Sequence, residues 1–364
     1  MPPHQHDALI TRLKTILLAM QRASWEQALA AQALYEWRPD EELPSIVGLA
    51  YDMIARSDSL GRLGVLLNET DQSSLDFCAI GECLVFLHHQ TRDTIWLSAA
   101  RSLVGYIRRT AGRSFEGLLV HRAGELWVDA LYMLPPALIA TGSSWNQDSL
   151  IFEGFQQLNG YEKYLRDQAT GLWSQSWNIE SHAIARREHL STGNGWAMAG
   201  CVRVLSLLPK EGWQEEAEQL AGKTLQTLRS VLAHQRPDGL FHFVLEDETS
   251  FVECTSAAMY AYSIYTLQLL GLLSAQAIEV KAADRMTTAL IALVDQDGHL
   301  RGCVLARKDG HEGNMQGRGT SAEGQAFLIM ALAAAGHLQG GGRHIHWTHL
   351  QAGSQENVSM YEEV

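Results

Sequence analysis

The sequence predicts an all-α protein, an (α/α)6 barrel in which six helical hairpins close into a ring, with short β-hairpins at one rim. Three observations support this prediction. Glycine turns recur at similar intervals, the segments between them have helical periodicity, and strand patterns occur only beside the turns. The turns begin at Gly61, Gly117, Gly171, Gly239 and Gly298, with spacings of 56, 54, 68 and 59 residues, the length of one helix pair with its connections.

A closed ring accounts for the repeat better than two separate domains or an open solenoid. The chain has 364 residues, 46% of them hydrophobic, which is enough to bury a large core. An open solenoid would expose apolar end faces, and neither terminus has the sequence of a polar cap. We expect one barrel domain over residues 1–338 and a loose C-terminal tail over residues 339–364, where a Gly-rich stretch replaces the apolar pattern.

Apolar residues at three- and four-residue spacing predict the helices. The run from Leu9 to Met20 has this spacing and predicts a first amphipathic helix. The other clear helical segments are Ser24–Glu36, Ala197–Leu208, Glu215–Ala233, Thr255–Leu273 and Ala322–Ala335. Pro135 and Pro136 follow a helical pattern and should kink or restart that helix, because proline removes an intrahelical hydrogen bond.

Strand patterns are short and lie next to the glycine turns. They cover Leu118–His121, Leu240–Val244 and Leu300–Val304. Pieces of this length form small hairpins at a rim and cannot form a central sheet.

Composition and charge exclude several classes of partner. The formal net charge is −13 and no run of Lys or Arg occurs, so nucleic acid and anionic membranes are poor partners. No uncharged apolar stretch is long enough to span a membrane. The segment from Met1 to Gln21 lacks the pattern of a secretion signal, so we expect a cytoplasmic protein.

The cysteines and histidines give no pattern of a cofactor or metal site. The five cysteines are scattered and include no C-x-x-C pair, which favours buried reduced thiols. His88 and His89 are adjacent and so point to different faces of a helix. We therefore predict no cofactor and no metal, and expect a small-molecule or oligosaccharide substrate as the partner. The sequence does not indicate an oligomeric state.

The densest group of candidate site residues runs from Glu125 to Met133. Glu125 and Asp129 are four residues apart, so on a helix both carboxylates would face the same way, between Trp127 and Tyr132. Acids among aromatic rings suit sugar chemistry, because rings stack on pyranose faces and a carboxyl of raised pKa delivers a proton. A capping role is the better interpretation of Glu125, whereas Asp129 lies among apolar residues and is the better catalytic candidate.

A second group combines aromatic residues with an asparagine. Trp173, Trp177 and Trp196 together with Asn194 predict a wall that binds the substrate, although tryptophans also serve as core residues. His242 lies in a third turn, where it either lines the cavity or has a structural role.

Matching segments in the same order give the chain a family resemblance. They are Met20–Gln27, Glu125–Asp129, Gly193–Trp196, Ala233–His242 and Ala322–Phe327. Over residues 10–335 the chain resembles fungal-type members of glycoside hydrolase family 105, the unsaturated rhamnogalacturonyl hydrolases, and more distantly the unsaturated glucuronyl hydrolases of family 88. The resemblance implies an (α/α)6 barrel that acts on a sugar bearing a 4,5-unsaturated uronic acid.

The resemblance also implies a reaction that uses two aspartates. An acid protonates the vinyl-ether double bond, water adds to the adjacent carbon, and the hemiketal collapses. One aspartate matches Asp129. The proton donor is expected at the end of a His-x-Trp-Asp motif, which here reads Gln175-Ser176-Trp177-Asn178.

An amide cannot cycle a proton near neutral pH, so Asn178 cannot serve as the general acid. Three alternatives follow: a hydrolase in which Asp129 or Glu180 supplies the proton, a repurposed enzyme that isomerises, dehydrates or cyclises a small natural product, or a non-catalytic sugar-binding relic. The candidate contacts for a substrate carboxylate are Arg186, Arg187, His189, Ser191 and Thr192.

Overall fold

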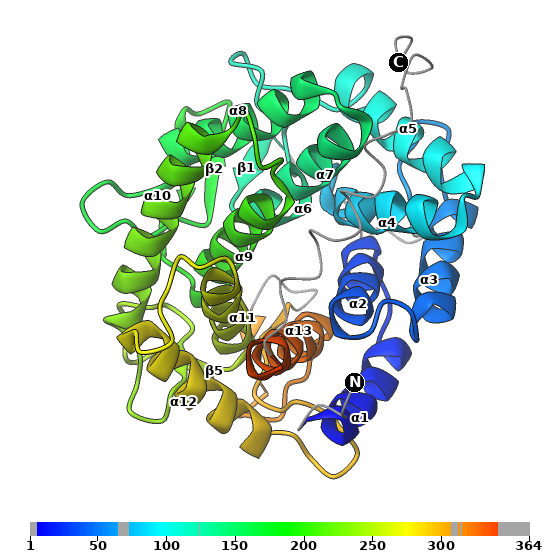
Figure 1. The fold of residues 1–364 in the computed structure, drawn as a ribbon. Helices are drawn as coiled ribbons and strands as arrows, with labels where there is room; N and C mark the ends of the chain where they lie inside the picture. Colours follow the sequence, from blue (N-terminus) through cyan, green and yellow to red (C-terminus); the bar gives the residue numbers. More distant parts are fainter. Residues whose placement is uncertain (1–5, 65–72, 123, 307–311, 314, 341–364) are drawn as a thin grey trace.

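The computed structural model describes residues 6–64, 73–122, 124–306, 312–313 and 315–340, and it shows a closed ring of helices in two layers (Figure 1). The inner layer consists of α2 (Ser24–Trp37), α4 (Gly81–Thr91), α6 (Ala130–Met133) with α7 (Pro135–Trp145), α9 (Ser191–Leu207), α11 (Thr255–Leu269) and α13 (Ala322–Gln339). The outer layer consists of α1 (Asp7–Ala19), α3 (Leu43–Ala55), α5 (Thr94–Arg109), α8 (Asp148–Leu165), α10 (Gln214–Leu232) and α12 (Ile278–Ala292). The predicted (α/α)6 barrel is confirmed, and α13 closes the ring by packing against α1 and α2.

The two layers differ in how their helices are buried. Nearly every residue of α2, α11 and α13 is buried, and these helices are rich in alanine and other small residues. Outer helices such as α5 bury one face and leave charged residues on the other. The sequence periodicity is therefore clearest in the outer layer, whereas the inner helices are buried on most sides.

The five repeated glycines close turns that pack against the neighbouring outer helix. All have positive φ, from 76° at Gly171 to 100° at Gly298, a conformation that favours glycine. A Cβ on Gly239 would lie 2.8 Å from the Arg285 carbonyl oxygen of α12, and a Cβ on Gly298 would lie 2.8 Å from the Arg12 carbonyl oxygen of α1. The repeat thus marks positions where each hairpin meets the next around the ring.

The strands lie at one rim and are shorter than predicted. A three-stranded antiparallel sheet contains β1 (Glu125–Trp127), β2 (Ser176–Asn178) and β3 (Ala183–Arg186). Two-residue pairs form between β4 (Phe241–His242) and β5 (Val252–Glu253) and between β6 (Leu305–Ala306) and β7 (Glu312–Gly313). The predicted strands Leu118–His121 and Leu300–Val304 contribute only the isolated bridges Arg113↔Leu119 and Val294↔Leu300.

Two local predictions meet different outcomes near residue 130. The helix restart is confirmed, because α6 ends at Met133 and α7 begins at Pro135. The prediction that Glu125 and Asp129 share a helix face is wrong: Glu125 lies in β1, and Asp129 lies just before α6.

A buried arginine crosses the barrel axis. The Arg203 cluster comprises Arg203 of α9, which is fully buried, together with Glu36 of α2, Glu82 of α4 and Tyr262 of α11. Arg203 Nη1 lies 2.5 Å from Glu36 Oε1 and 3.0 Å from the Tyr262 hydroxyl, and Nη2 lies 2.6 Å from Glu82 Oε2. Its guanidinium also lies 5.5 Å from the Tyr132 ring of α6. One side chain therefore links helices from several parts of the inner layer.

None of the helices in the described part of the chain is long and apolar enough to cross a membrane. The five cysteines are buried free thiols, and the Sγ atoms of Cys254 and Cys303 lie 3.5 Å apart. The predicted tail lies outside the described residues from position 341 onward.

Candidate active site

Asp129 occupies the position before the first residue of α6, but its side chain does not cap the helix. The carboxylate is half-buried and instead accepts a hydrogen bond of 2.8 Å at Oδ2 from Gln175 Nε2. The backbone brings the two residues together, because the Val128 N–H donates to the Gln175 carbonyl oxygen at the end of the β1–β2 pairing. Asp129 is therefore free of the capping role that acids commonly have at this position.

The surroundings of Asp129 favour its protonated form. Burial raises the pKa of Asp129, and the nearby carboxylate of Asp76 raises it further. His121 and the hydrogen bond from Gln175 oppose this shift, but the net pKa lies above the usual value of an aspartate. A carboxyl with a raised pKa is a suitable proton donor at mildly acidic to neutral pH.

Asp76 and His121 form a second polar pair beside Asp129. Asp76 begins the 3-10 helix η1 (Asp76–Ile80), and its Oδ1 lies 2.6 Å from His121 Nε2. Burial lowers the pKa of His121, but the Asp76 carboxylate outweighs that effect and the pKa of His121 is raised overall. The other ring nitrogen, Nδ1, is buried and has no hydrogen-bond partner among the described residues.

The sequence prediction missed Asp76. Glu82, the acid in the first turn of α4, belongs to the Arg203 cluster instead. Asp76 is an acid shortly before an apolar, small-residue helix, but η1 separates it from α4 and obscures this pattern in the sequence.

One wall of the site contains an aromatic ring and a guanidinium. Trp127 lies with its ring centroid 6.2 Å from that of His121, and the Arg122 guanidinium lies 5.5 Å from the Trp127 ring. Glu125 Oε2 accepts a hydrogen bond of 2.8 Å from the Trp127 indole, which fixes the ring. Arg122 Nε is buried without a hydrogen-bond partner among the described residues.

Aromatic residues fill the barrel axis next to this site. The Tyr132 ring lies 5.1 Å from Trp196 and 5.4 Å from Phe327, and its hydroxyl donates to Gln32 Oε1 at 2.7 Å. Tyr132 is fully buried and Trp196 is 7% exposed. Tyr132 thus has a core role in place of the predicted substrate contact, whereas Trp196 retains a small accessible surface.

The other predicted aromatic residues point toward the outer helices. Trp173 donates its indole N–H to Thr227 Oγ1 of α10 at 3.3 Å, and Trp177 packs 5.0 Å from the Tyr164 ring of α8. Asn194 is fully buried, and its side chain bonds both the N–H and the carbonyl of Trp173. These contacts give all three residues structural roles and do not place them in the predicted binding wall.

The predicted histidines are engaged with neighbouring loops. His242 Nδ1 lies 2.9 Å from the Ser250 carbonyl oxygen, and its Nε2 lies 2.9 Å from Arg236 Nη1. His189 is buried and lies 2.7 Å from Glu246 Oε2. Neither contact involves the group around Asp129.

Among the described residues, no hydrogen bond joins Asn178 to Asp129. In the β1–β2 register Asn178 pairs with Glu125, four residues before Asp129, and its Oδ1 accepts the Ser181 N–H at 2.8 Å. Glu180 is exposed in the turn that follows. The side chain from this segment that contacts Asp129 is Gln175.

The acids that begin the later inner helices also have structural partners. Glu253 is buried and accepts hydrogen bonds from the backbone of Thr255 and Ser256 and from the hydroxyl of Ser191. Glu323 Oε1 accepts the Trp25 indole N–H at 2.8 Å. Both residues order the N-terminal ends of the inner helices.

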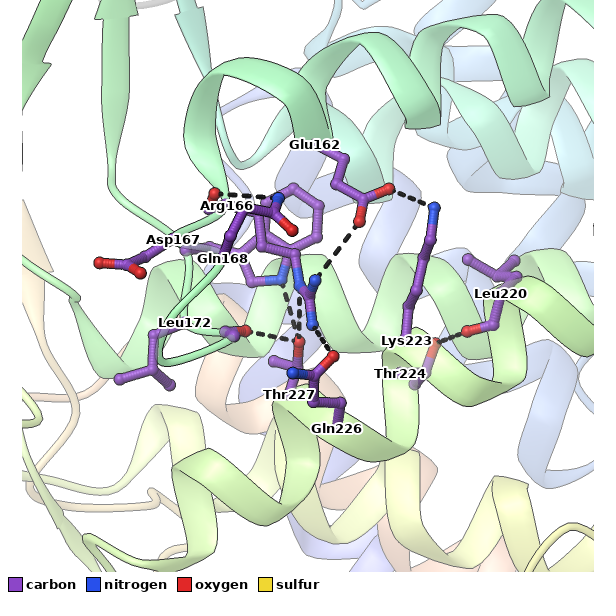
Figure 2. Close-up of polar contacts among 12 residues, drawn as sticks. Glu162, Arg166, Asp167, Gln168, Leu172, Leu220, Lys223, Thr224, Gln226 and Thr227 are labelled. Carbon is purple, nitrogen blue, oxygen red and sulfur yellow. Dashed lines mark hydrogen bonds and ion pairs between the residues drawn. The ribbon is translucent and has the colours of Figure 1, made fainter.

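A cleft on the outer wall is separate from this chemistry. It lies between α8 and α10, over α9, and is lined by Phe155, Met198, Cys201, Leu220 and Thr224 among others. Figure 2 shows Glu162 between Arg166 and Lys223, with Oε2 2.6 Å from Lys223 Nζ. Glu162 is thus paired with Lys223 and Arg166, and we assign these ion pairs to helix packing.

One turn brings together possible metal ligands. Ligand atoms of Asp295, Asp297 and His299 lie within 4.8 Å of one another. Asp295 already pairs with Arg301 at 2.7 Å and accepts the backbone N–H groups of Asp297 and His299. This is the hydrogen-bonding pattern of the turn itself, and it gives no ground for a metal.

The family model for Glycosyl Hydrolase Family 88 matches residues 7–337. The chain belongs to glycosyl hydrolase family 88. The barrel fold agrees with this assignment, and the resemblance found in the sequence is confirmed at the level of the family.

The chain is also similar to individual proteins in sequence and in fold. The chain is 25% identical to the unsaturated rhamnogalacturonyl hydrolase YesR of Bacillus subtilis (strain 168) over 235 residues, which cover 62% of this chain and 65% of YesR. A possible member of the GH105 family from Salmonella enterica serovar Paratyphi A superposes with a TM-score of 0.77 at 17% identity, covering 93% of this chain and 97% of that one. The unsaturated glucuronyl hydrolase of Bacillus sp. GL1 superposes with a TM-score of 0.63 at 14% identity, covering 87% and 85%. These structures share the fold.

Proposed function

We propose that the protein hydrolyses oligosaccharides that carry a 4,5-unsaturated uronic acid at the non-reducing end, with Asp129 as the general acid and base. The observation that carries the proposal is a half-buried carboxyl of raised pKa that caps no helix and lies beside the Asp76–His121 pair. Family membership and the similarity to YesR support the substrate class.

The reaction needs one group that first gives and then takes a proton. Protonated Asp129 transfers its proton to C4 of the C4=C5 double bond, and the positive charge that develops at C5 is shared with the ring oxygen. Water adds at C5 while the Asp129 carboxylate accepts its proton, which restores the acid. The resulting hemiketal opens and releases the second sugar. The raised pKa of Asp129 suits this cycle, because a larger fraction carries a proton at a given pH.

The neighbouring residues offer complementary roles. His121 Nδ1 is a buried ring nitrogen with no hydrogen-bond partner among the described residues, and it suits a bound internal water. Arg122 stands beside Trp127, its Nε has no hydrogen-bond partner among the described residues, and it is the basic group that suits the uronate carboxylate, with Trp127 stacking on the sugar ring. Among the basic residues predicted from sequence, His189 is already paired with Glu246.

In this proposal the site keeps its acid even though position 178 has an asparagine where the family motif has an aspartate. Asn178 pairs with Glu125 and serves the β2–β3 turn, so the proton comes from Asp129. This arrangement favours a retained hydrolase over the repurposed enzyme or the binding relic.

The test is turnover of unsaturated rhamnogalacturonan and glucuronan disaccharides, followed as loss of ultraviolet absorbance from the conjugated double bond. We expect decay with at least one substrate, and Asp129→Asn should lower kcat/KM by about 10²–10⁴-fold. Asp148→Asn, an exposed Asp-to-Asn control in the first turn of α8, should keep full turnover. Absence of decay at high protein concentration, or unchanged turnover in Asp129→Asn, would reject the proposal.

A further inference from the structure

The Gln175 side chain is held in one place from several sides. Gln175 is only 5% exposed. Its backbone N–H donates to the Arg186 carbonyl oxygen at 3.1 Å, and its backbone carbonyl accepts the Val128 N–H at 3.0 Å. The side-chain Nε2 donates to Asp129 Oδ2 at 2.8 Å, while Oε1 is buried with no hydrogen-bond partner among the described residues. An unpaired buried acceptor is costly, so its retention calls for a reason.

Gly193, near the start of α9, makes room for this unpaired oxygen. A Cβ on Gly193 would lie 2.6 Å from Gln175 Oε1 and 3.1 Å from Val128 Cγ1. The N-terminus of a helix carries partial positive charge, which favours an oxygen on that side of the amide. The opposite end of the amide then presents its N–H to the Asp129 carboxylate, so both electrostatic preferences select the same orientation.

We propose that Gln175 is a positioning residue that fixes the Asp129 carboxyl and reserves Oδ1 as the oxygen that carries the catalytic proton. The N–H of Gln175 occupies Oδ2, and a donor at this oxygen disfavours a proton there. The amide does not titrate, so this selection holds at every pH at which the fold persists. The inference rests on the proposed function of Asp129 and deepens it, because it names which oxygen faces the double bond.

The first experiment measures the Asp129 carboxyl directly. Protein labelled with ¹³C at the aspartate carboxyl carbons is titrated by NMR, and Asp129→Asn identifies the resonance. The groups facing Asp129 are Asp76 from η1, His121 from the loop before β1 and Tyr161 from α8, and their contributions are common to all variants.

Two variants disturb the amide by different routes. Gln175→Met removes the donor and keeps the length of the side chain, whereas Gly193→Ala displaces the amide without removing it. Both variants should move the inflection of the Asp129 NMR titration curve to higher pH, because each removes a hydrogen bond to the charged form of the carboxyl. Gln219→Met, an exposed glutamine on α10 bonded to Glu215, is the matched control and should leave it unchanged. An unchanged inflection in both test variants, each shown to be folded by circular dichroism, would overturn the inference.

The second readout is the pH profile of kcat/KM on the substrate turned over by the wild type. In Gln175→Met and Gly193→Ala the alkaline limb should move to higher pH together with the NMR inflection, and the plateau should fall about tenfold or more because the proton is no longer directed at the substrate. If the wild type turns over no substrate but the two variants shift the Asp129 titration curve as expected, the proposed function is rejected and the positioning role is kept. Turnover with an unshifted inflection would reject the positioning role alone.

Discussion

At the scale of single residues, the chemistry of the site depends on where three polar side chains lie relative to one carboxyl group. Asp129 is half-buried and gains a raised pKa from burial and from Asp76, while Gln175 and His121 limit the shift. These partners come from η1, the residue before β2 and the loop before β1, so no local stretch of sequence contains the site.

Asn178 provides a test of how the motif maps onto the structure. Asn178→Asp should leave kcat/KM within about twofold and the free energy of unfolding within ~0.5 kcal/mol, because the new carboxylate can still accept the Ser181 N–H in an exposed turn. The comparison is steady-state turnover alongside Asp129→Asn. A tenfold or larger rise in kcat/KM would return Asn178 to the proton-donor position that the sequence motif suggested.

The His121–Asp76 pair should contribute to stability in a pH-dependent manner. Burial lowers the pKa of His121, but the Asp76 carboxylate outweighs that effect, so the folded-state pKa lies above the usual value of a histidine. The stabilisation from protonated His121 is therefore fully present below the unfolded pKa and is lost as pH rises through the higher folded value. His121→Gln should cost more free energy of unfolding at about pH 6 than at about pH 9. Urea unfolding of both proteins at the two pH values measures this, and equal costs would contradict the ion pair.

At the scale of elements, the recurring glycine turns determine how each hairpin meets the next outer helix. Gly239 combines a φ of 88° with a Cβ position 2.8 Å from a carbonyl oxygen of α12, whereas Gly212 has a φ of 87° with no atom within 4 Å of its Cβ position. The two positions therefore separate the conformational cost of an alanine from the cost of close packing.

Gly239→Ala should destabilise the fold more than Gly212→Ala does. In both variants a Cβ at positive φ should lower the free energy of unfolding by about 1–2 kcal/mol. Gly239→Ala should lower it by about 1–3 kcal/mol more, because α12 must shift. Chemical denaturation measures both values. If the two variants lost the same stability, contact between the turn and α12 would contribute nothing.

At the scale of the whole molecule, the Arg203 cluster ties the inner layer together across the axis. Arg203 pairs with Glu36 and Glu82 while fully buried, so its loss leaves two carboxylates in the interior without their cation. Tyr132 of α6, the helix that begins directly after Asp129, packs against both Arg203 and Trp196, so the packing of the axis also supports the element next to Asp129.

Arg203→Met should lower the free energy of unfolding by about 3–5 kcal/mol, the usual cost of breaking a buried ion pair from one side. Arg203→Lys keeps the charge but loses the planar fork and should fall between the wild type and Arg203→Met. Equilibrium urea unfolding gives the values. A loss below about 1 kcal/mol for Arg203→Met would show that the cluster is not needed to hold the ring.

The sequence by itself determined the helices, the turns and the closed ring, because helical periodicity and the positive φ of glycine are local properties that repeat along the chain. It also singled out Asp129, since a carboxyl among apolar residues needs a reason to be there. Only the tertiary structure decided the partners of Asp129. Gln175 lies 46 residues away and His121 meets Asp76 across 45 residues, and such contacts depend on how the hairpins pack around the axis. For the same reason the contacts of Trp173, Trp177 and Asn178 could not be predicted, since local periodicity cannot tell which neighbouring segment a side chain will meet.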